Sequence, residues 1–307
     1  MGLSTACCAV KWGNEYGGLR LPAGYVFTTK EAGVQATMKD FLTGLAQEAG
    51  QMALAYRARG QELQVDFKSE RDLVTEADRA IEEMIVAAIA RRYPGHGVTG
   101  EEGGDQAGLE YRWIIDPIDG TAAFVHDQPF FSTSIAVERA GEVVLGAVCA
   151  PVLGELYLAE RGGGAWCNGR RLRVSRRGRL GESMLATGFA CLRSGLAENN
   201  LPYLLALLPQ LRDLRRYGSA AIDLAYVAAG RLEGYWELNL HEYDVAAGLL
   251  LVAEAGGRYS DFRGARAGLY GEVAASNGLV HEALLAAFAA VRAARQGASG
   301  AGPVART

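Results

Sequence analysis

Trp113 to Thr121 read W-I-I-D-P-I-D-G-T, and this stretch decides the fold and the chemistry of the chain. Its apolar beginning predicts a buried strand, and Pro117 fixes the backbone so that Asp116 and Asp119 leave the strand end toward one point. Two carboxylates held that close repel each other unless a cation lies between them. Gly120 lets the backbone approach an oxyanion, and Thr121 adds a hydroxyl beside it. The stretch therefore predicts ligands for a hard metal ion next to amides that suit a phosphate.

The same composition also suits a polar turn that caps the next helix, because Asp and Gly are ordinary turn residues. Three other acidic segments bear on this choice, and each has a simpler alternative. The pair Glu101 and Glu102 in a glycine-rich loop is compatible with a solvated surface. Asp78 is compatible with a capping box that begins at Thr75, and Asp244 with an acid that favours the helix dipole.

Taken together, the order, spacing and chemistry of these segments resemble the inositol monophosphatase family of lithium-sensitive, magnesium-dependent sugar phosphatases. The main signatures are G-E-E from Gly100, W-I-I-D-P-I-D-G-T from Trp113 and Y-D-V-A-A-G from Tyr243. Supporting matches are D-L-V-T-E-A-D at Asp72–Asp78, G-A-W-C-N-G at Gly164–Gly169 and E-A-G-G at Glu254–Gly257. The resemblance extends from about Met38 to about Ala290, and it favours the metal and phosphate interpretation of the first stretch.

The resemblance implies a site for two or three Mg²⁺ ions. The metal ligands that it implies are Glu101, Asp116, the backbone carbonyl of Ile118, Asp119 and Asp244. Glu101, Asp116 and Ile118 would hold the first ion. Asp116, Asp119 and Asp244 would hold the second ion, so Asp116 would bridge the two. Glu102 and Asp78 would stand near a third, weaker ion. Carboxylate and carbonyl oxygens are the ligands that Mg²⁺ prefers.

The resemblance also implies catalytic and substrate-binding residues. Thr121, hydrogen-bonded to Asp78, would orient and deprotonate the attacking water, with Glu101 as a further catalytic residue. The amides of Gly120 and Thr121 would bind phosphate oxygens. The residues implied to contact the alcohol part of the substrate are Asp119, Gly218, Ser219, Ala220 and Glu237. Ser219 is equally compatible with a helix N-cap, a role that does not exclude substrate contact.

Departures from the family pattern concern the substrate rather than the reaction. Ala122 and Ala123 replace a polar pair that often follows the Gly-Thr, and Tyr243 stands where tryptophan is common. His241 is a candidate for facing a second anionic group of the substrate, although a lone histidine is more often structural.

The predicted function is Mg²⁺-dependent hydrolysis of a small phosphate monoester, a phosphoric monoester hydrolase activity with myo-inositol 1-phosphate as the leading substrate. Competing substrates within the family are fructose 1,6-bisphosphate, histidinol phosphate, NADP and 3′-phosphoadenosine nucleotides. A different class of function is a catalytically idle regulatory or RNA-associated binding module that retains the fold. The full set of acids argues against this module, because a pure binder has no use for five converging carboxylates.

Bulk properties exclude several other classes. The net charge of −4 gives no electrostatic footprint for DNA, although arginines gather between Arg170 and Arg179. The five cysteines are odd in number and lack C-x-x-C spacing, so we expect neither a zinc site nor a disulfide framework. No apolar stretch predicts a membrane span. We therefore expect a cytoplasmic protein, and the resemblance implies a homodimer.

The expected fold is α+β and α/β, in the layered αβαβα sandwich of this sugar-phosphatase type. Residues 38–182 predict helices on a mostly antiparallel sheet, and residues 183–295 alternate between strands and helices as in a smaller α/β half. Residues 1–37 are Gly-rich and aperiodic, which predicts a disordered extension or a non-native start before a helix that opens at Met38. Residues 296–307 predict a disordered tail. The metals would lie between the two halves.

Overall fold

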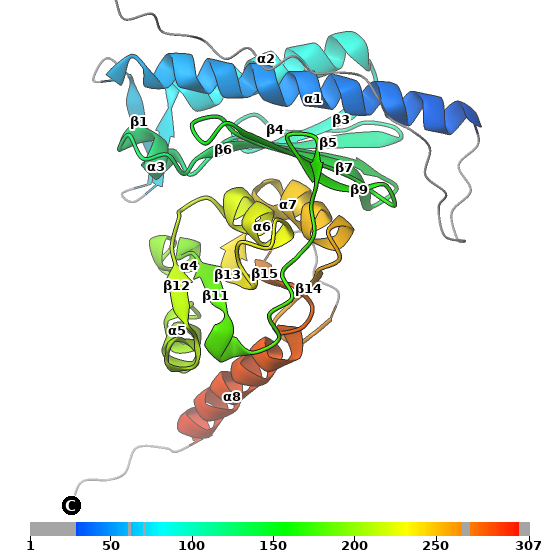
Figure 1. The fold of residues 1–307 in the computed structure, drawn as a ribbon. Helices are drawn as coiled ribbons and strands as arrows, with labels where there is room; N and C mark the ends of the chain where they lie inside the picture. Colours follow the sequence, from blue (N-terminus) through cyan, green and yellow to red (C-terminus); the bar gives the residue numbers. More distant parts are fainter. Residues whose placement is uncertain (1–28, 61–62, 70–71, 266–270, 301–307) are drawn as a thin grey trace, which may run out of the picture.

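The computed structural model describes residues 29–60, 63–69, 72–265 and 271–300. In this part of the chain, helices and sheets stack in the order αβαβα, which confirms the predicted sandwich (Figure 1). None of the helices in these ranges has the length and apolar character that a membrane span needs.

The first two layers are a pair of helices and a large sheet. Helices α1 (Thr29–Arg57) and α2 (Glu76–Arg92) lie along one face of the sheet (Figure 1). The sheet has eight strands in the order β10 (Arg170–Arg171), β9 (Gly164–Cys167), β8 (Glu155–Glu160), β7 (Glu142–Ala150), β6 (Ser132–Arg139), β5 (Tyr111–Asp119), β3 (Gly97–Gly100) and β4 (Gly104–Gln106). All pairs are antiparallel except β3 with β5, so the predicted mostly antiparallel sheet is confirmed. A separate hairpin joins β1 (Val65–Ser69) to β2 (Asp72–Thr75).

The central strand β5 is apolar without alternation because both of its faces are covered. Trp113 and Ile115 are buried in the core that the sheet forms with α1 and α2. Ile114 points the other way and is buried in the core formed with the helices of the middle layer. Successive side chains of a strand point to opposite faces, so a strand between two helical layers needs an unbroken apolar run.

The middle layer and the second sheet form the other half of the molecule. Helices α6 (Ala220–Ala228) and α7 (Glu242–Glu254) lie between the two sheets (Figure 1). The second sheet has five strands in the order β12 (Asp213–Arg215), β11 (Met184–Thr187), β13 (Gly234–Leu240), β15 (Gly271–Ser276) and β14 (Arg258–Ser260). β11 is parallel to β12 and β13, and the other pairs are antiparallel. Helices α5 (Leu201–Leu207) and α8 (His281–Gly300) form the outer layer, and the short helices are α3 (Thr121–Val125), α4 (Ala190–Arg193), η2 (Leu180–Glu182) and η3 (Leu208–Gln210).

Several predicted boundaries were wrong. Helix α1 begins at Thr29 rather than Met38, and α8 continues to Gly300, so residues 296–300 are helical rather than a disordered tail. Residues 1–28 and 301–307 lie outside the described part of the chain. Once a helix has formed, each added residue gains one backbone hydrogen bond, so a helix extends past the end of its apolar stripe. Helix α5 is short, because Pro202 lies in its first turn and Pro209 lacks an amide for a further turn.

Glycines let the middle helices approach their neighbours closely. Gly248 on α7 lies against α6, where an added Cβ would stand 2.7 Å from the Cβ of Leu224. Gly146 on β7 lies against the backbone of α7, where an added Cβ would stand 3.0 Å from the Cα of Ala247. Helix α7 therefore packs against both α6 and the first sheet at distances that leave no room for another methyl group.

We predict that Gly248→Ala destabilises the protein by about 1–3 kcal/mol, because the new methyl group overpacks the contact with Leu224. Gly44→Ala is the matched control, since an added Cβ on this exposed glycine of α1 meets nothing within 4 Å. That variant should gain about 0.4–1 kcal/mol from the smaller entropy of its unfolded chain. Urea denaturation measures both changes, and equal stabilisation of the two variants would contradict this account of the α6–α7 contact.

Candidate active site

A bulge at the end of β5 brings Asp116 and Asp119 to the same face of the sheet. Asp116 lies opposite Ser134 of β6, whereas Asp119 lies opposite Ser132. An advance of three residues along β5 therefore corresponds to two residues along β6, which means that β5 carries one extra residue. Residues two apart on a strand share a face, and the extra residue therefore turns both acids the same way. Pro117 sits in the bulge, where no ladder hydrogen bond is needed from it, and its carbonyl accepts a hydrogen bond from Thr133 Oγ1 at 2.9 Å.

Asp244, at the start of α7, joins this pair from the other half of the chain. One carboxylate oxygen from each of Asp116, Asp119 and Asp244 can be chosen so that all three lie within 4.8 Å of one another. In the described part of the chain, this is the group of three acidic side chains whose oxygens come this close together. Glu101 and Ile118 line the same cavity, but Glu101 is not part of the tight group. The structure thus brings together the residues that the sequence predicted as metal ligands, although Glu101 stands farther out.

Helix ends hold one oxygen of two of these acids. Asp119 Oδ2 accepts the Ser219 hydroxyl at 2.6 Å and the Ala221 amide at 2.7 Å, at the first turn of α6. Asp244 Oδ2 accepts the amide of His241 at 2.6 Å, at the start of α7. Asp116 differs, because its Oδ1 is buried and has no hydrogen-bond partner among the described residues. A buried carboxylate oxygen without a partner is costly, and a bound cation would satisfy it.

Burial and mutual repulsion change the acidity of the three carboxyl groups. Burial raises the pKa of Asp116 well above its ordinary value, and the charges of Glu101, Asp119 and Asp244 raise it further. Burial also raises the pKa of Asp244 well above its ordinary value, with Asp119 as the next cause. The pKa of Asp119 rises to about 6, because burial outweighs its hydrogen bonds from Ser219 and the α6 amides. Three ionised carboxylates at this site are therefore unfavourable without a bound cation, and their oxygens suit a hard divalent ion.

A buried acid that the sequence analysis did not identify supports the loop that carries Glu101. Glu82 of α2 accepts hydrogen bonds from the amides of Glu102 at 3.0 Å and Gly103 at 2.5 Å. Gly100 must lack a side chain, because an added Cβ would stand 2.5 Å from the carboxylate of Glu82. The signal was present in the sequence, since Glu82 interrupts the apolar stripe of its helix one turn after Asp78.

Asp78 performs the capping role and also lies near the acidic group formed by Asp116, Asp119 and Asp244. Its Oδ2 accepts the Thr75 amide at 2.8 Å and the Thr75 hydroxyl at 2.6 Å, which completes the capping box of α2. Its Oδ1 is 3.5 Å from Thr121 Oγ1, which also donates to the Ile118 carbonyl at 3.1 Å. Burial raises the pKa of Asp78 to about 7. The predicted Thr121–Asp78 pair is therefore close in space, and the capping alternative holds at the same time.

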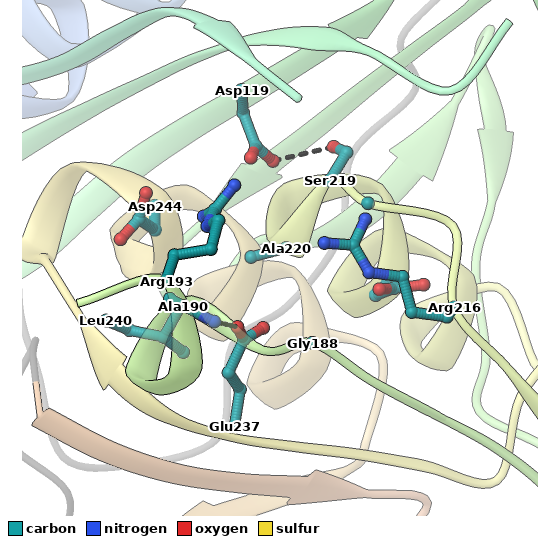
Figure 2. A pocket seen from close by; sticks show the side chains of 12 residues that line it. Asp119, Gly188, Ala190, Arg193, Arg216, Ser219, Ala220, Glu237, Leu240 and Asp244 are labelled. Atoms are coloured by element: carbon teal, nitrogen blue, oxygen red, sulfur yellow. Dashed lines mark hydrogen bonds between the residues drawn. The ribbon is translucent and has the colours of Figure 1, made fainter. Parts of the chain in front are cut away.

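A second cavity adjoins the first on the side of the second sheet (Figure 2). Gly218, Ser219, Ala220 and Glu237 line it, as the predicted substrate contacts should. Ser219 is also the N-cap of α6, since its hydroxyl accepts the Ile222 amide at 3.2 Å. The oxygens of Glu237 are already engaged, because they accept the Tyr235 hydroxyl at 2.6 Å and the Ala190 amide at 2.9 Å.

Three charged residues of this second cavity were missed by the sequence analysis. Arg193, Arg216 and Asp223 all line it, and Arg193 lines the first cavity as well. Asp223 is buried with one carboxylate oxygen unpartnered within the described residues. Arg216 lies two residues before Gly218 of the predicted substrate loop, so the sequence could have identified it as a candidate. Arg193 belongs to none of the motifs.

Three predicted site residues do not line either cavity. They are Asp78, which contacts Thr121, together with Glu102 and His241. His241 is exposed, and its ring stacks on Tyr243 with centroids 5.0 Å apart. The next residue, Glu242, forms an ion pair with Arg112 of β5 at 2.6 Å, which links α7 to the first sheet. The geometry therefore favours structural roles for this segment before Asp244.

We predict that Asp116→Asn raises the melting temperature of the metal-free protein by about 2 °C or more, because it removes one charge from a repelling buried cluster. The same variant should lose most of the stabilisation that saturating Mg²⁺ gives the wild type, about 2.7 kcal/mol at 100 times the dissociation constant. Asp105→Asn, at an exposed position on β4, is the control and should change neither quantity. Thermal denaturation with and without Mg²⁺ checks both, and full Mg²⁺ stabilisation of Asp116→Asn would contradict the metal assignment.

Comparison with known proteins agrees with this geometry. Residues 34–293 match the inositol monophosphatase family. An inositol-1-monophosphatase of Mesorhizobium japonicum is 43% identical over 256 residues, which cover 82% of this chain and 96% of that protein. The Nus factor SuhB of Pseudomonas aeruginosa is 44% identical over 247 residues, covering 78% of this chain and 91% of that protein. Among solved structures, the extragenic suppressor protein suhB of Bartonella henselae is 39% identical with a TM-score of 0.78, covering 82% of this chain and 98% of that chain. The chain therefore belongs to the inositol monophosphatase family.

Proposed function

We propose that the protein catalyses Mg²⁺-dependent hydrolysis of a small phosphate monoester, with myo-inositol 1-phosphate as the leading substrate. Membership of the family supports a phosphatase, and relatives named inositol-1-monophosphatase support this choice of substrate. The observation that carries the proposal is the convergence of Asp116, Asp119 and Asp244 beside the Thr121–Asp78 pair. A metal cluster next to a hydroxyl that can orient water is the arrangement that hydrolysis of a dianionic ester requires.

The residues that would hold Mg²⁺ follow from the donor set. Asp116, with its unpartnered buried oxygen, would hold Mg²⁺ together with Asp119 and Asp244, which each keep one oxygen that no helix end holds. Glu101 and the Ile118 carbonyl complete the proposed set at the wall of the same cavity. Bound Mg²⁺ would lower the pKa of water and stabilise the negative charge on the departing alcohol. Two or three ions per site remain a prediction.

The chain itself supplies groups for moving a proton and binding phosphate. Thr121 Oγ1 lies between Asp78 Oδ1 and the Ile118 carbonyl, so a water that donates to this hydroxyl would be held in a fixed direction. The proton that water loses would pass through the Thr121 hydroxyl to Asp78, a buried carboxyl group whose Oδ1 faces this hydroxyl. Gly120 has a left-handed φ of 95° at the N-cap of α3, and its amide and that of Thr121 are proposed to bind phosphate oxygens.

The alcohol part of the substrate is proposed to occupy the second cavity. Gly218 and Ala220 line it without bulky side chains, which leaves space for a ring with hydroxyl groups. Asp119 and Ser219 lie at its border with the metal cluster and are proposed to contact the hydroxyl nearest the phosphate. Glu237 is proposed to fix the cavity wall, since both of its oxygens already accept hydrogen bonds from the protein.

We predict that Thr121→Ala lowers kcat for inositol 1-phosphate by about 10²-fold, because the water and the proton path lose the hydroxyl that holds them. Thr121→Ser keeps the hydroxyl and is the matched control, so it should retain most of the turnover. Steady-state phosphate release at saturating Mg²⁺ measures both variants. Equal activity of Thr121→Ala and wild type would remove the Thr121–Asp78 pair from the mechanism without affecting the metal site.

A panel of phosphate esters tests the proposed substrate. We expect the highest kcat/KM for inositol 1-phosphate and lower values for fructose 1,6-bisphosphate, histidinol phosphate, NADP and 3′-phosphoadenosine nucleotides. Phosphate release with and without Mg²⁺ is the measurement, and Asp116→Asn should release none. A higher kcat/KM for another ester would change the substrate and keep the reaction class.

A regulatory or RNA-associated role is the second candidate. Relatives at similar identity are named Nus factor SuhB, and that name is the observation that favours it. All the arginines of the basic segment are exposed, as an RNA contact would require: Arg170, Arg171, Arg173, Arg176, Arg177 and Arg179. Absence of phosphate release from every ester in the panel would make this the leading function. The homodimer, the cytoplasmic location and lithium sensitivity also remain predictions.

A further inference from the structure

Arg193 lies where the two cavities meet. Four residues line both of them: Asp119, Arg193, Gly218 and Asp244. Of the described residues, Arg193 is the basic one in this shared set. Figure 2 shows its side chain extending from α4 toward the part of the site that Asp119 and Asp244 occupy. A substrate with its phosphate at the metal cluster and its alcohol in the second cavity would have to pass this side chain.

The guanidinium of Arg193 is available for a ligand. It is exposed, and no hydrogen bond or ion pair joins its side chain to another described residue, although its charge acts on the nearby carboxylate of Glu237. Two other arginines near the middle layer are engaged, since Arg112 pairs with Glu138 and Glu242, and Arg231 pairs with Glu155. A guanidinium beside several carboxylates that stays unpaired is suited to an anion that arrives from solution.

The protein holds Arg193 in place through the ends of α4. Before the helix, Gly188 O accepts Asn200 Nδ2, and the Ala190 amide donates to buried Glu237 at 2.9 Å. After it, Ser194 Oγ accepts a hydrogen bond from Asn239 Nδ2 at 3.0 Å. Asn239 itself has a left-handed φ of 66°, a backbone conformation that residues other than glycine rarely adopt. These contacts fix the backbone from which Arg193 extends toward the junction of the two cavities.

We propose that Arg193 binds the phosphoryl group of the substrate, donating two N–H groups to nonbridging oxygens on the side away from the metal ligands. This inference rests on the proposed function, because it places the phosphate at the metal cluster. A phosphate monoester carries two negative charges, and the planar fork of a guanidinium matches two phosphate oxygens. Arg193 would thereby contact the substrate directly, from a short helix that lies outside the quoted motifs.

Arg216 is the matched comparison for Arg193. It is also an exposed arginine, but it lines only the second cavity and not the metal cavity. Loss of Arg216 removes the same charge at a position that would face the alcohol part of the substrate. The two arginines therefore separate a direct phosphate contact from a general effect of positive charge.

The test uses the full chain and inorganic phosphate as the probe, with calorimetry in saturating Mg²⁺. We expect Arg193→Gln to raise the dissociation constant for phosphate by about 10-fold or more, as loss of charge-assisted hydrogen bonds implies. Arg193→Lys should recover part of the affinity, because it restores the charge without the fork. Arg216→Gln should leave phosphate affinity within about twofold of wild type, and it should raise KM for inositol 1-phosphate.

The outcomes separate this inference from the proposed function. Unchanged phosphate affinity of Arg193→Gln overturns the inference, as does wild-type protein that binds no phosphate in Mg²⁺. An equal loss in both glutamine variants also overturns it, since general charge would then suffice. Phosphate binding that depends on Arg193 in a protein without turnover would uphold the inference and reject the proposed function. Melting temperature and Mg²⁺ affinity should not change in Arg193→Gln, which excludes a merely structural effect.

Discussion

Repulsion among buried carboxylates is the constraint on which the rest of the structure depends. Asp116 and Asp119 are buried, Asp244 is partly buried, and the three lie close together; a cluster of this kind is stable only with a cation, protons or strong hydrogen bonds. The fold supplies amides from helix ends, with α6 binding Asp119 and α7 binding Asp244. Helix N-termini carry partial positive charge, so they offset part of the repulsion while leaving other oxygens for a ligand.

The same hydrogen bonds connect the site to the whole architecture. Helix α7 presents Asp244 and is packed between the two sheets, with Gly146 and Gly248 allowing the close approach. The bulge in β5 presents Asp116 and Asp119 from the first half of the chain. A shift of α7 would separate Asp244 from its partners, so packing far from the site sets the geometry of the acids.

Structural and chemical roles are not alternatives in this protein. Asp78 completes the capping box of α2 with one oxygen and faces Thr121 with the other. Ser219 caps α6 and also donates to Asp119. A carboxylate has two oxygens and several lone pairs, which lets one oxygen order the backbone while the other remains available to a ligand. Asp78 and Ser219 therefore cap helices and contact site residues at the same time, and neither role excludes the other.

The sequence by itself determined the acids, the buried strand before them and the helices that follow, because these features rest on local spacing and apolar pattern. Only the tertiary structure decided which oxygens stay free, where the helices end and which distant side chains enter the site. Glu82 stands out in the sequence as an acid on an apolar helix, but only the folded glycine loop shows what it supports. Arg193 enters the site only because α4 reaches the junction of the two cavities. Local patterns record contacts within a few residues, whereas these contacts join segments far apart in the chain and depend on long-range packing.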